Sequence, residues 1–336
     1  MPFAIEVENL EKTFPGGVKA LAGVSFGVDE GTVFGLLGPN GAGKTTVVRI
    51  LTTILKPDVG SARVLGHDVE REPDLVRTLF GLAGQYAAVD ENLTGRENLV
   101  MVSRLNNMSK PDSATRANEL LSEFDLVDAG DRVLKTYSGG MRRRLDVAAA
   151  LVTRPRVLFL DEPTTGLDPK SRNDLWDVIE QLVSAGTTVL LTTQYLEEAD
   201  RLAHRVAVVD RGELISQGTP AELKSNFGSS VLEVGFLDAV TAGTAIEPLS
   251  ALGGHPAHLI AATVEMTLDD GADNVIRAIR ALDAAGLHPS AISVREPSLD
   301  DVFLSLTGRQ AVAVENTDSD AAAAKPSRRR GKRSDA

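Results

Sequence analysis

The residues with the clearest chemical meaning lie in one glycine-rich segment, residues 38–45, which reads GPNGAGKT. It matches the pattern G-x-x-x-x-G-K-[ST], in which glycines let successive backbone N–H groups converge on phosphate oxygens. Lys44 adds a cation near the outer phosphates, and the Thr45 hydroxyl is a ligand type for Mg²⁺. We therefore predict a nucleotide-phosphate site here, in preference to a flexible glycine turn. The predicted phosphate-binding residues are Gly38, Pro39, Asn40, Gly41, Ala42, Gly43, Lys44, Thr45 and Thr46.

Two adjacent carboxylates, Asp161 and Glu162, end the apolar run VLFLDE. Charged groups at a buried strand end are costly unless a cation needs them. With Mg²⁺ as that cation, we assign Asp161 to the metal and Glu162 to the attacking water, as general base or orienter. An adjacent pair of acidic residues is a weak signal for a catalytic site when it stands alone, and a strong one in a chain that also has a phosphate loop. We therefore predict that Glu162 and Lys44 are both catalytic.

A third segment, residues 137–144, reads YSGGMRRR and opens a helical pattern. A Ser-Gly-Gly turn at a helix start offers a second set of backbone N–H donors to an anion. The three arginines that follow are expected to pair with acidic neighbours or to line a subunit interface, rather than to bind nucleic acid.

Strands and helices must position these motifs, and short strand-like runs alternate with longer helical patterns up to about residue 219. This alternation predicts an α/β unit with a largely parallel sheet. The stretch 94–135 is mainly helical, with capping-box spacing at Thr94 and Glu97, and predicts an inserted helical subdomain. The strand-like runs beside the motifs are residues 32–37, 157–160 and 187–193.

Beyond the first unit, residues 221–309 carry no phosphate-type motif and mix strand-like runs with a helical stripe. They predict a small C-terminal α+β accessory domain. The last segment, 310–336, is too polar to offset its ordering entropy and predicts a disordered tail. Its basic end could touch anionic lipid or nucleic acid, but a solvated tail is favoured. The predicted helical stripe consists of Val275, Ile276, Ile279 and Leu282.

Composition narrows the possible functions. With 35 basic and 47 acidic side chains the net charge is −12, so no nucleic-acid partner is expected. The absence of cysteine excludes disulfides, thiolate metal sites and a cysteine nucleophile. The apolar runs are far shorter than the roughly 18 to 20 residues of a membrane span. The N-terminal residues also lack a signal-peptide pattern, so we expect a cytoplasmic protein.

The order of the motifs along the chain resembles the order found in a known protein family. The phosphate loop, the SGG turn, the acidic strand and then GLD are similar to the nucleotide-binding subunit of ATP-binding cassette (ABC) transporters, over about residues 3–220. The phrases TYSGGMRRRLD, DEPTTGLDP, LLTTQYLEEAD and PSLDDVFLSLTG resemble the daunorubicin-resistance type of drug-export ATPase. The resemblance implies the P-loop α/β fold of ABC ATPases: a mostly parallel sheet core, an antiparallel β subdomain, a helical insert and a small C-terminal α+β domain.

The resemblance implies roles for three further residues of the same subunit. Phe14 matches the aromatic that stacks on adenine, although an ordinary core aromatic is an open alternative. Gln85 matches the glutamine that reaches Mg²⁺ and the attacking water. Gln194 stands where the family normally has histidine; its amide can donate a hydrogen bond but cannot become cationic. We predict that Gln194 senses the γ-phosphate and that turnover is slow.

The resemblance also implies a homodimer across two ATP molecules. Ser138, Gly139 and Gly140 match the signature that closes over the γ-phosphate bound by the partner subunit. Asp168 matches the residue that links the two sites across the dimer. The implied cofactors are ATP and Mg²⁺.

The expected function is ATP hydrolysis that drives efflux of a hydrophobic drug, antibiotic or lipid through a separate ABC-2-type permease. The chain would then lie at the cytoplasmic face of the cell membrane. The alternatives are an import ATPase and a soluble ABC-type ATPase acting on DNA or ribosomes; the single cassette without sustained heptads disfavours the latter. The C-terminal domain is expected to steady the dimer or dock the permease through PSLDDVFLSLTG, with binding of a small regulator as a further alternative.

Overall fold

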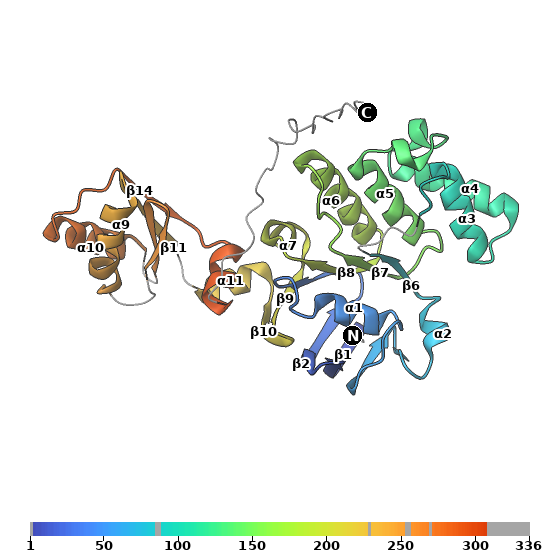
Figure 1. The fold of residues 1–336 in the computed structure, drawn as a ribbon, viewed down its shortest axis with the longest axis horizontal. Coiled ribbons are helices and arrows are strands. Elements are labelled where there is room, and N and C mark those ends of the chain that lie inside the picture. The colour runs from blue at the N-terminus through green and yellow to red at the C-terminus, as the bar shows by residue number, and fades with distance from the viewer. Residues whose placement is uncertain (1–2, 85–88, 228–229, 253–256, 269–270, 308–336) are drawn as a thin grey trace, which may run out of the picture.

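A six-stranded sheet forms the centre of the molecule (Figure 1), with the order β10-β9-β3-β8-β7-β6. Its neighbours are parallel except for β10 and β9. The strands are β3 Val33–Leu37, β6 Phe80–Ala83, β7 Val157–Asp161, β8 Thr188–Thr193, β9 Arg205–Asp210 and β10 Glu213–Gly218. Every residue of β3, β7 and β8 is buried, as expected of parallel strands that are covered on both faces. The computed structural model describes residues 3–84, 89–227, 230–252, 257–268 and 271–307.

The two faces of this sheet build two separate hydrophobic clusters. On β7, Val157 and Phe159 belong to the first cluster, whereas Leu158 and Leu160 belong to the second, because successive strand residues point to opposite faces. The first cluster lies under α1 (Lys44–Leu51) and an antiparallel sheet of order β2-β1-β4-β5. The strands of that sheet are β1 Phe3–Phe14, β2 Val18–Asp29, β4 Val59–Val64 and β5 His67–Asp68.

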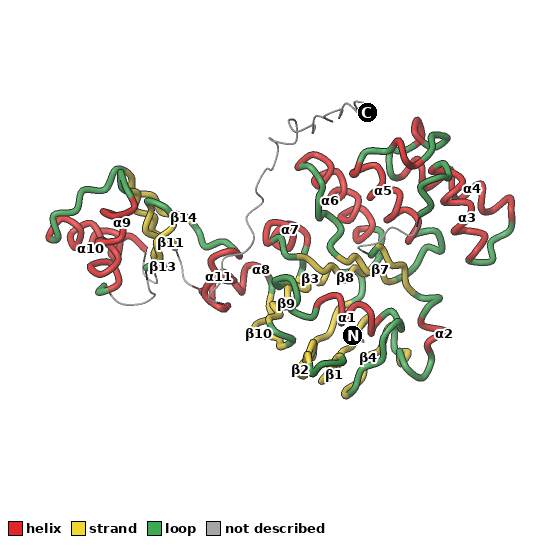
Figure 2. The backbone as a smooth tube through the Cα atoms, in the orientation of Figure 1, coloured by secondary structure: helices red, strands yellow, loops and turns green. Residues whose placement is uncertain are grey.

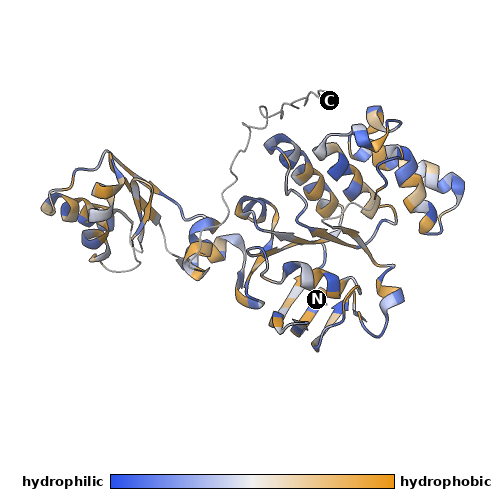
Figure 3. Cartoon of the chain, in the orientation of Figure 1, coloured by the Kyte–Doolittle hydropathy of each residue, from blue (hydrophilic) through white to orange (hydrophobic). Residues whose placement is uncertain are grey.

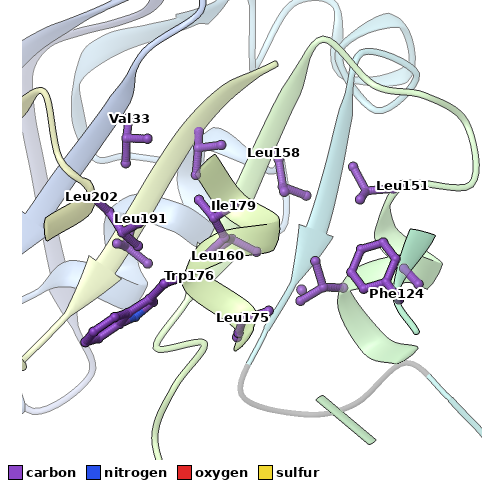
Figure 4. Close-up of a cluster of buried hydrophobic side chains, with 14 of the residues drawn as sticks. Val33, Phe124, Leu151, Leu158, Leu160, Leu175, Trp176, Ile179, Leu191 and Leu202 are labelled. Carbon is purple, nitrogen blue, oxygen red and sulfur yellow. The ribbon is translucent and has the colours of Figure 1, made fainter. Parts of the chain in front are cut away.

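Helices cover the opposite face of the central sheet. The second cluster, part of which Figure 4 shows, packs the strands against three helices that follow the motifs. Trp176 and Ile179 on one of these helices are buried there beside Leu191. The helices are α5 Gly139–Ala150, α6 Pro169–Ser184 and α7 Leu196–Leu202.

The predicted helical insert follows β6 along the chain and consists mainly of α3 (Gly95–Leu105) and α4 (Lys110–Glu123), which lie side by side at one end of the molecule (Figure 2). The predicted capping box is confirmed: the Thr94 side chain accepts from Glu97 N–H, and Glu97 accepts from Thr94 N–H. The short helix α2 (Pro73–Val76) precedes β6. Phe124, at the end of α4, is fully buried in the second cluster, so the insert shares the core of the cassette.

The C-terminal region has its own antiparallel sheet, of order β12-β13-β11-β14, and its own apolar cluster. The predicted stripe on α10 is partly wrong. Leu282 is buried and Val275 packs against the cluster, but Ile276 and Ile279 are 47% and 43% exposed. The small Ala278 takes the fully buried position, which turns the two isoleucines to the flank of the helix. The elements are β11 Ser230–Gly235, α9 Ala239–Ser250, β12 His258–Ile260, β13 Thr263–Leu268, α10 Gly271–Ala284 and β14 Ala291–Arg295.

Two helices join this region to the cassette. α8 (Pro220–Phe227) leaves the cassette, and α11 (Leu299–Thr307) returns to pack against α8 and α7. Val302 and Phe303 of α11 belong to the second cluster of the cassette, so PSLDDVFLSLTG buries apolar side chains there. The predicted boundaries at residues 220 and 309 remain predictions, as does the tail 310–336, which lies outside the described residues.

Candidate functional site

The carboxyl ends of β3, β7 and β8 meet at one edge of the central sheet. β8 lies between the other two strands and pairs with both in parallel: Thr193 lies opposite Leu37 of β3, and Thr192 lies opposite Asp161 of β7. Gly38, Glu162 and Gln194 each come directly after one of the strands, so they are brought to the same edge. This edge is where open α/β sheets bind ligands.

The glycine-rich loop connects β3 to α1, as predicted. Gly43 has a φ of 109°, and a Cβ on it would lie 2.4 Å from the Ala20 carbonyl oxygen, so only glycine fits there. Gly43 is also the N-cap of α1 and provides no side-chain cap. The first N–H groups of α1 are therefore left for an anion, which the positive end of a helix favours.

Lys44 is held between the loop and the acidic strand end. Its Nζ donates to the carbonyl oxygens of Gly38 (2.7 Å) and Pro39 (3.1 Å), and it lies 3.5 Å from Glu162 Oε1. The side chain is only 4% exposed. Burial lowers the pKa of Lys44, and the negative charges of Glu162 and Asp161 oppose that shift. A phosphate at the loop would compete with these carbonyl groups and carboxylates for the ammonium.

Asp161 and Thr45, the predicted metal ligands, are adjacent. Asp161 Oδ1 accepts from Thr45 Oγ1 at 3.2 Å and from Thr192 Oγ1 at 2.5 Å. Sequence reasoning missed Thr192, whose only signal was a threonine at the end of a buried strand-like run. Within the described residues no group of three or more His, Cys, Asp or Glu could hold a metal ion. A cation here would therefore need further ligands from phosphate or water, as Mg²⁺ commonly takes.

Glu162 has an unusual backbone. Its φ is 50°, in the left-handed region that non-glycine residues rarely adopt. Its N–H donates to both the carbonyl oxygen and the hydroxyl oxygen of Thr192, each at 3.1 Å. Such strained residues persist only where their surroundings hold them, and they cluster at functional sites.

A pocket of about 480 Å³ lies against the phosphate loop, whose residues form part of its lining. Phe14, half-buried at the end of β1, lines it and belongs to none of the apolar clusters, so the structure places this aromatic beside the loop. Sequence reasoning missed Val18 and Ala20, which line the same pocket from β2. The full lining is Phe14, Val18, Ala20, Asn40, Gly41, Ala42, Gly43, Lys44, Thr45, Thr46 and Glu162.

The predicted signature lies elsewhere. Ser138 caps α5 by accepting from Met141 N–H, and a Cβ on Gly140 would lie 2.3 Å from Ser171 Oγ, so α5 begins against the start of α6. A separate pocket of about 360 Å³ is lined by residues that include Gly139 and Glu162. Within one chain, the SGG turn therefore does not reach the phosphate-loop pocket.

Asp168 comes directly after Leu167, which lines the second pocket, and Gln194 lies at the sheet edge. Asp168 caps α6: it accepts from the N–H and the hydroxyl of Ser171, and the N–H bond helps to lower its pKa. Gln194 is half-buried between β8 and α7, and its Oε1 is buried without a hydrogen-bond partner in the described part of the chain. Such an acceptor is costly, and a donor would satisfy it. Gln85 lies outside the described residues.

Comparisons with known proteins identify relatives of this chain that agree with the site described above. A profile of the ABC transporter family matches residues 21–165. The daunorubicin/doxorubicin resistance ATP-binding protein DrrA of Streptomyces peucetius is 52% identical over 310 residues, which is 92% of this chain and 93% of that protein. The doxorubicin resistance ATP-binding protein DrrA of Mycobacterium tuberculosis is 46% identical over 309 residues, with 90% and 93% covered.

A solved structure shares the fold of the cassette. The dimeric post-hydrolysis state of an ATP-binding cassette bound to ADP and phosphate superposes with a TM-score of 0.59 and 25% identity. The match covers 64% of this chain and 98% of that one. The predicted P-loop α/β fold of ABC type is therefore confirmed. By its sequence relatives and by the geometry of its phosphate loop and acidic strand end, the chain belongs to the daunorubicin-resistance family of ATP-hydrolysing subunits of ABC transporters.

Proposed function

We propose that this chain powers the export of a hydrophobic drug, antibiotic or lipid through a separate ABC-2-type permease at the cytoplasmic face of the membrane. Two relatives are named for drug resistance and another for Nod factor export, which supports export rather than import, and their similarity extends over at least nine tenths of the chain. Among the helices of the described residues, none has the length and apolar character of a membrane span. The observation that carries the catalytic part is the convergence of Lys44, Asp161 and Glu162 at one sheet edge.

In this proposal Thr45 and Asp161 hold Mg²⁺, and their adjacent oxygen atoms are of the kind that this ion prefers. The ion would neutralise charge on the β and γ phosphates. Lys44 leaves its carbonyl partners to bind the outer phosphates, and Phe14 stacks on the adenine. Gln85 would act beside the metal, as the family resemblance implies.

Glu162 is the residue that we propose for the water chemistry. Its carboxylate lies 3.5 Å from Lys44 Nζ and lines both pockets, so it can orient a water at the γ-phosphate and accept its proton. Gln194 follows the neighbouring strand. Its Oε1, which has no hydrogen-bond partner among the described residues, and its amide N–H₂ suit a group that changes its hydrogen bonds when the γ-phosphate is present or absent.

Two copies would pair head to tail, so that Ser138, Gly139 and Gly140 of one chain close over the ATP of the other. The separation of the SGG turn from the phosphate-loop pocket within one chain supports this arrangement. The dimer of the similar solved cassette also supports it. Asp168, at the start of α6, would then lie at the contact between the two sites.

The test is transport in inverted membrane vesicles that contain this chain and the permease. We expect ATP-dependent accumulation of a fluorescent hydrophobic drug such as daunorubicin, and none with Glu162→Gln. ATP hydrolysis without drug accumulation would contradict the export of this substrate class, while leaving the ATPase assignment intact.

A further inference from the structure

Arg143 is a largely buried cation on α5, the helix that begins with the SGG turn, five residues after Ser138. Its side chain is 13% exposed. Among the described residues it forms one ion pair, with Asp146, at 3.0 Å between Nη1 and Oδ2. A guanidinium stays charged and needs partners for its other N–H groups when it is removed from water.

Those partners are main-chain carbonyl groups from the motif segments. Nε donates to the Pro163 oxygen at 2.7 Å, and Nη2 donates to the Asp161 oxygen at 3.3 Å. Nη1 donates to the oxygen of Gly84, directly after β6, at 2.6 Å. Asp161 and Pro163 are the two chain neighbours of Glu162, so one guanidinium holds the carbonyl groups on both sides of it.

This arrangement explains how Glu162 keeps its left-handed backbone. Thr192 holds the N–H of Glu162, and Arg143 holds the carbonyl groups of the residues directly before and after Glu162. Without the guanidinium, the backbone could relax toward an ordinary conformation and turn the carboxylate away from Lys44.

The neighbouring arginines make different contacts. Arg142 pairs with Glu91, and Arg144 donates to the carbonyl oxygen of Phe124. Of the three, Arg143 alone is seen to reach the acidic strand end among the described contacts. From sequence the three residues look alike, because only packing decides which of them points inward.

We propose that Arg143 is a positioning residue for ATP hydrolysis, which fixes the backbone of Glu162 and connects it to the helix that begins with the SGG turn. The proposal rests on the proposed role of Glu162. Because that turn is proposed to close over the ATP of the partner subunit, α5 would link closure at one site to the direction of the carboxylate at the other.

The test compares Arg143→Gln and Arg143→Lys in the full chain. A matched control, Arg156→Gln, removes an arginine from an exposed ion pair with Glu30. Three quantities are measured: ATP affinity with Mg²⁺, the single-turnover hydrolysis rate and the melting temperature. We expect Arg143→Gln to hydrolyse ATP about 10- to 100-fold more slowly, with its ATP affinity within about threefold of wild type. Arg143→Lys should recover part of the rate, and Arg156→Gln should match wild type.

A merely structural role would lower ATP affinity and the melting temperature together with the rate. That result, or a rate within about threefold of wild type for Arg143→Gln, would overturn the proposal. If Arg143→Gln does not fold, Arg143→Lys must by itself show slower hydrolysis at unchanged affinity. Glu162→Gln separates the two ideas: if it still hydrolyses ATP, the role of Glu162 fails, and if it does not, a normal Arg143→Gln refutes only the present inference.

Discussion

The cassette and the C-terminal domain differ in where their strands end. In the cassette the parallel strands β3, β7 and β8 end at one edge, so the residues that follow them meet there. In the C-terminal domain the strands are antiparallel and their ends alternate between two edges. Along the helices of both parts, hydrophobic and hydrophilic residues alternate (Figure 3). In this chain, the direction of the strands therefore brings the motif residues together at one edge of the cassette, and the C-terminal sheet has no equivalent edge among its described strands.

The polar residues of the C-terminal sheet gather instead around one arginine. Arg295 on β14 bonds to Glu233 on β11 (2.5 Å), Glu265 on β13 (3.2 Å) and Asp301 on α11 (2.6 Å). Because α11 packs against α7 and α8, this cluster connects the sheet to the cassette. Its ion pairs connect the C-terminal sheet to α11.

The largest expected effect separates the two regions by chemistry. Glu162→Gln should lower the rate of ATP hydrolysis by about 10²- to 10⁴-fold, because it removes the proposed base, and it should leave ATP binding in place. The matched change Glu265→Gln in the C-terminal sheet should leave hydrolysis near the wild-type rate. Steady-state ATPase assays check both variants, and equal losses in the two would contradict the assignment of the catalytic chemistry to the cassette alone.

The second prediction concerns whether α11 forms part of the cassette or of the C-terminal domain. Phe303 is 4% exposed in the cluster of the cassette, so Phe303→Ala should lower the free energy of unfolding of the cassette by about 3–5 kcal/mol. Leu249→Ala, in the C-terminal cluster, should destabilise only the C-terminal domain. Calorimetry with and without ATP distinguishes the units, because ATP raises the melting temperature of the unit that binds it. Loss of only the ATP-insensitive transition in Phe303→Ala would assign α11 to the C-terminal domain.

A smaller effect concerns the sheet edge itself. Gln194→His should give the hydrolysis rate a new pH dependence near pH 6 to 7, because histidine titrates there and glutamine does not. We expect a change of about tenfold or less across that range. A rate–pH profile that is identical to the wild-type profile would remove Gln194 from the site.

The smallest expected effect concerns the ion pairs that Arg295 forms between the C-terminal sheet and α11. The hydrogen bond from Arg295 holds the pKa of Glu233 below its ordinary 4.5, so the stabilisation is present above that pH and is lost as the pH falls through the lower folded-state value. Glu233→Gln should destabilise the C-terminal domain by about 0.5–1 kcal/mol near pH 7, since the pair is partly exposed. Thermal unfolding at a series of pH values below 7 checks this: the difference between the variant and the wild type should shrink as the pH falls below 4.5, and a difference that stays constant or grows would contradict the prediction.

Local sequence signals correctly predicted the structural elements that surround the candidate site. The strand, loop and helix around Lys44, the acidic strand end at Asp161 and the Thr94 capping box depend on neighbours in the chain, and the structure confirms these three features. The α10 stripe was partly wrong, because periodicity identifies an apolar face but not the rotation that packing selects. Thr192 and the contacts of Arg143 could not be predicted, since their partners are distant in sequence.

Residue types at short spacings were enough to predict three local features: a phosphate-loop motif, a carboxylate that could hold a metal ion, and a glutamate directly after the same strand. These follow from residue types at short spacings, which dictate backbone conformation and ligand type locally. Two features follow from the packing of distant segments. Arg143, rather than Arg142 or Arg144, binds the carbonyl groups on both sides of Glu162, and α11 packs with the cassette. The physical reason is that burial and long-range hydrogen bonds arise when separate segments pack together, and no local pattern contains that information.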